Sequence, residues 1–227
     1  MNAFSDLFAF LAGVPAVAGL VLTALIVFLT SDWRLSLTAL LVQYIFVGLA
    51  LTRTIQTEIA LVKILIGVLA VSILYLTARR IQEEAGSQPE VESSPRFLGL
   101  SVRWGAGPLG LPLRLLAVVL VTLGLVRLFM GYRFPLAPAD IAFVVFWMGS
   151  MGIMGLVLSG DPLRVAAAML TILAGFDLVY ATLEPSVSIA GFWGALTLMA
   201  ALAFAYLATI HALSVKRAEL DEEEMDQ

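Results

Sequence analysis

The sequence predicts an all-α, polytopic membrane protein with about seven transmembrane helices. Two observations lead to this fold class. Hydrophobic residues make up 61% of the 227 residues and charged residues only 13%, whereas soluble domains carry about 25% charged residues. The apolar residues also fall into long runs that are broken by short polar segments, and the mean hydropathy is +1.00.

A helix needs about 20 apolar residues to cross the hydrocarbon core of a bilayer. Seven stretches satisfy this, at about 7–30, 34–52, 58–78, 112–131, 138–158, 162–183 and 187–213. The first is expected to be a retained helix, bent near Pro15, because residues 1–12 contain no Lys or Arg and a signal peptide begins with a basic region. Between the fifth and sixth helices, Asp161 is expected to cap the next helix, with Pro162 in its first turn.

These spans divide the chain into four parts: a three-helix half at 1–78, a polar loop at 79–111, a four-helix half at 112–213 and an acidic tail at 214–227. Within the loop, 83–94 has the composition of a disordered segment. Residues 97–104 are more apolar and are either an interfacial segment or an ordinary loop. The tail carries six acidic residues from Glu219 to Asp226, as either a solvated end or a docking site for a basic partner.

The distribution of Lys and Arg predicts an N-terminus outside and a C-terminus inside, in the inner (cytoplasmic) membrane of a cell. Nine basic residues lie on the side that includes the C-terminal tail, and three lie on the other. The nine are Arg34, Arg79, Arg80, Arg96, Arg103, Arg114, Arg164, Lys216 and Arg217, and the three are Arg53, Arg127 and Arg133.

Composition excludes several classes of function. There is no cysteine and one histidine, His211, so thiolate metal sites, iron–sulfur clusters and a haem with two histidine ligands are ruled out. We expect no metal, no cofactor and no nucleic-acid partner. No catalytic motif of a soluble enzyme is present, and His211 is expected to be an interfacial anchor near the end of the last helix.

Lys63 and Asp177 are charged residues inside apolar helices, where a charge is costly unless it is paired or hydrated. At 1.5 Å per residue, Lys63 lies about 7–8 Å below the outer edge, Asp177 about 9 Å and Arg127 about 6 Å. The common depth predicts a buried polar cluster in which Asp177 bonds with Lys63, with Arg127 or with both.

Two roles for this cluster stay open: a station in a proton or ion path, and a neutralised ion pair that fixes helix register. The path is harder to complete on the inner side, where only Gln43, Thr38, Thr171 and His211 could continue it. Gln43 is expected to bond a neighbouring helix and serve in helix packing.

The stretch GIMGLVLSGDPLRVAAAMLTILAGFDLVYATL (152–183), followed by a third helix, resembles subunit K of NADH-quinone oxidoreductase. That family includes the C component of multisubunit cation/proton antiporters and the E component of membrane-bound hydrogenases. The resemblance implies that Asp177 falls near a membrane-embedded carboxylate implicated in proton transfer and that Arg164 matches the basic residue after the turn. The family's usual acid is Glu, and its third helix carries a second acid that has no counterpart here.

The resemblance leads to the expectation of an accessory integral membrane subunit in a complex-I-like, antiporter-like or hydrogenase-like proton-translocating assembly. Its expected role is mainly structural, with a share in proton transfer through Asp177 and Lys63 as the second option. The expected partners are the lipid bilayer and other integral membrane subunits. The alternatives are a stand-alone small transporter or channel, which needs a polar path across both leaflets, and a membrane scaffold without a transport role.

Overall fold

The computed structural model describes residues 12–30, 32–53, 55–84, 96–97, 100–101, 110–132, 138–184 and 186–225. These residues form seven helices and one short antiparallel hairpin. The helices are α2 (Val14–Leu29), α3 (Trp33–Leu51), α4 (Thr57–Glu84), α5 (Gly110–Gly131), α6 (Ala139–Leu158), α7 (Pro162–Leu183) and α8 (Val187–Met225), and the hairpin strands are β1 (Arg96–Phe97) and β2 (Leu100–Ser101).

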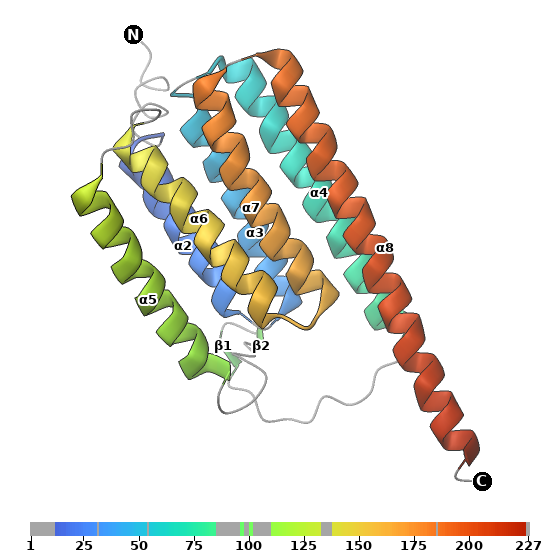
Figure 1. Ribbon diagram of the computed structural model, residues 1–227. Helices are drawn as coiled ribbons and strands as arrows, with labels where there is room; N and C mark the ends of the chain where they lie inside the picture. Colours follow the sequence, from blue (N-terminus) through green and yellow to red (C-terminus); the bar gives the residue numbers. More distant parts are fainter. Residues whose placement is uncertain are drawn as a thin grey trace.

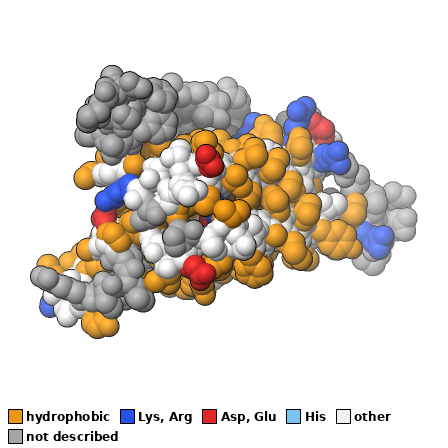
Figure 2. All heavy atoms as spheres, turned by 90° about the horizontal axis from the view of Figure 1, so that it is seen from above, with side chains coloured by type: hydrophobic (Ala, Val, Ile, Leu, Met, Phe, Trp, Pro, Cys, Tyr) orange, Lys and Arg blue, Asp and Glu red, His pale blue; other side chains and the backbone are white. Residues whose placement is uncertain are grey.

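The predicted helical fold is confirmed for the described residues. Six helices, α3 to α8, are long and apolar enough to cross a membrane. The seventh, α2, is apolar but has 16 residues in the described part of the chain. Large hydrophobic side chains such as Leu65, Leu120 and Leu202 are exposed on the helices. In the end-on view of Figure 2, hydrophobic side chains lie around an area of backbone and other side chains, with a few acidic and basic side chains among them. Such a surface is suited to hydrocarbon, and the chain is a multi-pass helical membrane protein.

The helices form two layers, with α2, α3 and α4 in one and α6, α7 and α8 in the other (Figure 1). Within each layer, consecutive helices are antiparallel neighbours. Between the layers, α2 packs on α6, α3 on α7 and α4 on α8. Each of these three pairs runs in the same direction, so the two layers repeat one three-helix arrangement. The fifth helix, α5, lies outside both layers against α6 and α2.

Glycines allow the closest helix contacts, as expected where lipid provides no hydrophobic drive between helices. A Cβ atom on Gly19 of α2 would lie 2.5 Å from the Phe46 ring of α3. One on Gly152 of α6 would lie 2.4 Å from Ile172 of α7 and 2.9 Å from a backbone oxygen of the same helix. Gly152 therefore lies at a close contact between α6 and α7, whereas Gly149 has open space around it.

Local sequence explains the helix starts. Asp32 and Asp161 each accept a hydrogen bond from a backbone N–H two residues later, at the first turns of α3 and α7. The predicted cap at Asp161 is thus confirmed. Pro15 occupies the first turn of α2. A backbone N–H at that position would have no partner within the helix, so the helix loses no hydrogen bond to proline. The expected bend near Pro15 depends on residues 1–11, which lie outside the described part of the chain.

Two helices extend beyond the predicted spans. Helix α4 continues to Glu84, into the segment expected to be a loop, and α8 continues to Met225, through most of the predicted tail. At 1.5 Å per residue the 39 residues of α8 span about 58 Å, which exceeds the hydrocarbon thickness of about 30 Å. The loop residues 85–95, 98–99 and 102–109 lie outside the described part of the chain.

Candidate functional site

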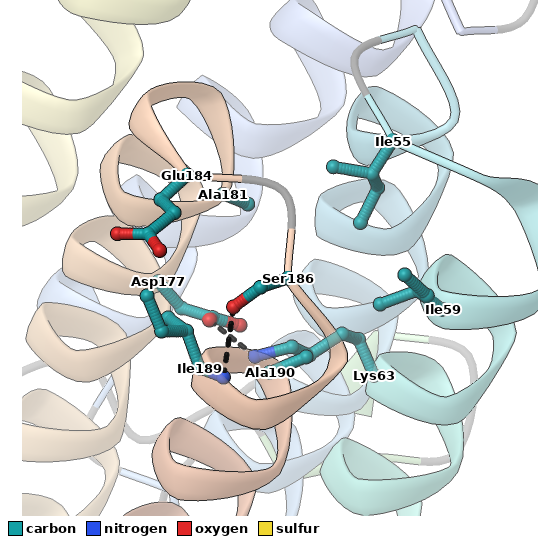
Figure 3. Close-up of a pocket in the computed structure, with 9 residues that line it drawn as sticks. All are labelled: Ile55, Ile59, Lys63, Asp177, Ala181, Glu184, Ser186, Ile189 and Ala190. Atoms are coloured by element: carbon teal, nitrogen blue, oxygen red, sulfur yellow. Dashed lines mark hydrogen bonds and ion pairs between the residues drawn. The ribbon is translucent and has the colours of Figure 1, made fainter.

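Lys63 of α4 and Asp177 of α7 form a buried ion pair in which the Lys63 Nζ donates to the Asp177 Oδ1. The two side chains point toward one another (Figure 3) and are only 5% and 12% exposed. The pair joins the two layers of the bundle, because α4 and α7 belong to different layers. The predicted contact between these residues is confirmed.

The pair lies at the end of the bundle where α7 connects to α8, which we call the α7–α8 end. It borders a small cavity between this connection and the start of α4 (Figure 3). The cavity is lined by Ile55, Ile59, Lys63, Asp177, Ala181, Glu184, Ser186, Ile189 and Ala190. Its volume of about 10 Å³ is close to the minimum that one water molecule requires.

Most of the cavity wall is apolar, so it offers few alternative partners to the two charges. Ser186 accepts a hydrogen bond from the backbone N–H of Ile189 in the first turn of α8. Glu184, at the end of α7, is exposed. Because the surroundings supply so little polarity, Lys63 and Asp177 depend on each other to offset the cost of leaving water.

Arg127 is not part of this site. Its side chain is exposed on α5, the helix outside both layers, and it does not line the cavity. The prediction of a buried three-residue cluster is therefore wrong for Arg127. The estimated depths correctly paired Lys63 with Asp177. Depth alone, however, does not tell which face of its helix a residue occupies, and Arg127 is on an exposed face.

Polar side chains continue from the ion pair toward the middle of the bundle. The Tyr44 hydroxyl of α3 donates to the Leu170 carbonyl oxygen of α7 at 3.4 Å. On α8, the buried Thr197 hydroxyl donates to the Trp193 carbonyl oxygen of its own helix at 2.8 Å. The Tyr44 ring fits against α4 because of Gly67, where a Cβ atom would lie 2.3 Å from the Tyr44 Cγ.

At the same level of the bundle, Gln43 of α3, the neighbour of Tyr44 in the sequence, meets Thr171 of α7. The Thr171 hydroxyl donates to its own helix at Ala167, at 2.9 Å, and lies 3.5 Å from the Gln43 Oε1. Gln43 thus contacts a neighbouring helix, as predicted. Its Nε2 atom is buried without a hydrogen-bond partner, so the polar series ends in an unsatisfied donor near the middle of the layers.

Sequence reasoning missed Tyr44, Thr197 and Arg114. The first two look like ordinary residues of apolar helices, and only the packing of the bundle shows that both are buried. Arg114 was assigned to a membrane surface, yet it is buried, and its Nη1 donates to the carbonyl oxygens of Phe28 and Leu29 at the end of α2. His211 is exposed on α8.

The described residues contain no group of three or more His, Cys, Asp or Glu side chains that could hold a metal ion. Fold and site together define a multi-pass helical membrane protein with a buried ion pair between two three-helix layers. Compared with known proteins, the chain matches no family model, no curated protein and no solved structure.

Proposed function

We propose that the chain is an accessory integral membrane subunit of a proton-translocating assembly of the complex-I, antiporter or hydrogenase type. The observation that carries the proposal is the buried Lys63–Asp177 pair beside a cavity that holds at most about one water. Ionisable pairs at such depth are costly in a membrane and occur mainly where protons or ions are handled. The resemblance of residues 152–183 to subunit K agrees with this role.

The distribution of buried polar side chains favours a subunit that contributes part of a path. The ion pair lies at the α7–α8 end, and Tyr44 and the unpaired Gln43 amide lie near the middle of the bundle. A stand-alone channel or transporter would need comparable groups in the other half. There the described core between the layers is built mainly from apolar residues such as Ala166, Leu37 and Leu40, so a larger partner subunit would have to complete the path.

The proposed topology has seven spans, with α2 as the first, the N-terminus outside and the C-terminus inside. Because the chain has no cysteine, a single introduced thiol reports its own position. Glu184→Cys, at the exposed α7–α8 end, should react with a membrane-impermeant maleimide added to intact cells. Gln82→Cys, exposed near the opposite end of α4, should react only after the membrane is opened. The reverse pattern, or equal labelling of both, contradicts this orientation.

The proposed function is tested in the native membrane with a tagged chain. We expect it to co-purify in stoichiometric amount with quinone-type, antiporter-type or hydrogenase-type membrane subunits in a mild detergent. Proton pumping is then measured in inverted vesicles that carry the Lys63→Met/Asp177→Leu double variant, which removes both charges and keeps side-chain volume. A chain that purifies only as a homo-oligomer and conducts ions alone in liposomes would refute the proposal.

The double variant also separates the two roles of the ion pair. If assembly is retained and pumping is lost, Lys63 and Asp177 take part in proton transfer. If assembly and pumping are both retained, their role is structural and the subunit acts by packing. The matched control is Arg53→Gln/Asp140→Asn, which removes an ion pair of 2.7 Å that also joins the two layers but is 36% and 39% exposed. Neither assembly nor pumping should change in that control.

A further inference from the structure

An open groove runs between α3 and α4 on the membrane-facing side of their layer. It is lined by Leu37, Thr38, Leu41, Val71, Ser72, Tyr75 and Leu76, and its volume is about 380 Å³. This volume lies within the range of about 300–1,000 Å³ that is typical of ligand sites. The groove lies far along α3 and α4 from the ion pair and belongs to no part of the candidate functional site.

The groove is chemically apolar, although two hydroxyl groups line it. The Thr38 hydroxyl donates to the Arg34 carbonyl oxygen at 2.7 Å, and the Ser72 hydroxyl donates to the Val68 carbonyl oxygen at 2.7 Å. Each hydroxyl proton is thus used within its own helix. A hydrocarbon chain can lie along this wall without leaving a donor unsatisfied.

One end of the groove is aromatic and basic. Tyr75 lines the groove and its ring centroid lies 5.6 Å from that of Trp33. The Arg34 guanidinium lies 5.3 Å from the Trp33 ring centroid, and its Nη2 donates to the Gln82 Oε1 at 2.9 Å. Tryptophan and tyrosine beside arginine are typical of the level of lipid headgroups.

Two further arginines follow on α4, one turn beyond the groove. Arg79 is four residues after Tyr75, and Arg80 is four residues after Leu76, so each lies on the same helix face as a groove residue. Arg79 is engaged with Glu83 at 2.7 Å, and Asp32 caps the start of α3. Arg34 and Arg80 are exposed, and neither forms an ion pair with a carboxylate among the side chains that the structure describes, a set that excludes Glu84.

We propose that this groove binds one anionic phospholipid, with an acyl chain between α3 and α4 and the phosphate group at Arg34 and Arg80. The apolar wall of the groove contacts the acyl chain, and Trp33 and Tyr75 lie at the level of the lipid headgroups. The two cations complement the negative charge of the headgroup. Arg34 uses one of its five N–H donors on Gln82 and can offer the others to phosphate oxygens.

The test is native mass spectrometry of the delipidated full-length chain, titrated with phosphatidylglycerol or with phosphatidylcholine of the same acyl composition. We expect phosphatidylglycerol to bind more tightly. Arg34→Gln and Arg80→Gln should each reduce its affinity about fivefold and reduce phosphatidylcholine binding less, because the choline cation already offsets the charge of that phosphate. Ser72→Trp, which fills the groove, should abolish the binding of both lipids at this site. Arg217→Gln, an exposed arginine on α8, is the matched control and should change nothing.

Any one of four results would overturn the proposal. The first is equal affinity for the two lipids, which means that the headgroup is not recognised. The second is unchanged phosphatidylglycerol affinity in the Arg34→Gln/Arg80→Gln double variant. The third is full displacement of phosphatidylglycerol by millimolar inorganic phosphate, which assigns the site to free phosphate. A groove that tolerates Ser72→Trp without losing lipid would equally contradict the placement of the acyl chain.

Discussion

Asp177→Asn should lower the free energy of unfolding by about 3–5 kcal/mol, the cost of leaving a buried charge without its partner. The substitution keeps the shape of the side chain but leaves the Lys63 ammonium, 5% exposed, beside a neutral amide. Lys63→Met should have a loss of similar size, because it isolates the Asp177 carboxylate. Thermal unfolding in detergent, followed by circular dichroism, measures both.

The Lys63→Met/Asp177→Leu double variant separates charge from packing. Replacing a buried ion pair by apolar residues of similar volume is often neutral or stabilising, so this variant should unfold at or above the wild-type temperature. The exposed Arg53–Asp140 pair provides the comparison, since removing it should cost no more than about 1 kcal/mol. If the double variant loses as much stability as Asp177→Asn, the packing around the pair determines the stability and the charge argument fails.

Gly152→Ala should lower the free energy of unfolding by about 1–3 kcal/mol, because the added methyl group overpacks the contact between α6 and α7. Its Cβ atom would lie 2.4 Å from the Ile172 Cγ1 and 2.9 Å from the Ala168 carbonyl oxygen. A side chain can rotate away, but the backbone of α7 can only shift as a whole. Chemical unfolding in mixed micelles gives the change in free energy.

Gly149→Ala, one turn earlier on the same helix, is the matched control. No atom of a neighbouring helix lies within 4 Å of a Cβ placed there. Its stability should be unchanged or higher by up to about 1 kcal/mol, since alanine has the better helix propensity. Equal losses at Gly149 and Gly152 would show that helix α6 tolerates no alanine at either position and that the α6–α7 contact is not the cause.

Hydropathy predicted the helices well because the hydrophobic requirement of a bilayer acts on each span separately. It could not predict their arrangement. The repeat of α2–α4 in α6–α8 depends on contacts between helices, such as that of Gly19 in α2 with the Phe46 ring in α3, and hydropathy does not report which residues meet. Nor did hydropathy show that α4 and α8 continue as helices beyond their apolar parts, because polar residues such as Gln82 and Arg217 suit a solvated helix and a loop equally.

Of the candidate site, the sequence predicted only the charged side chains, because charges are unusual inside apolar helices. Lys63 and Asp177 could be found because a charge in an apolar helix needs a partner, and the rise per residue placed them at one depth. Arg127 shared that depth, but it lies on an exposed face of α5. The sequence did not single out Tyr44 or Thr197. A hydroxyl group in an apolar helix can bond within its own helix, so its contacts with other helices are known only from the structure.

The two-layer arrangement has a consequence for how the protein is made. Lys63 and Asp177 are separated by 114 residues along the chain, and they belong to helices of different layers. If helices enter the bilayer in the order of synthesis, α4 arrives with its ammonium before α7 has supplied a carboxylate. Lys63, seven positions into α4, is close enough to the start of its helix for the side chain to extend toward the headgroups during this interval. Its final burial then marks the moment at which the second layer closes onto the first.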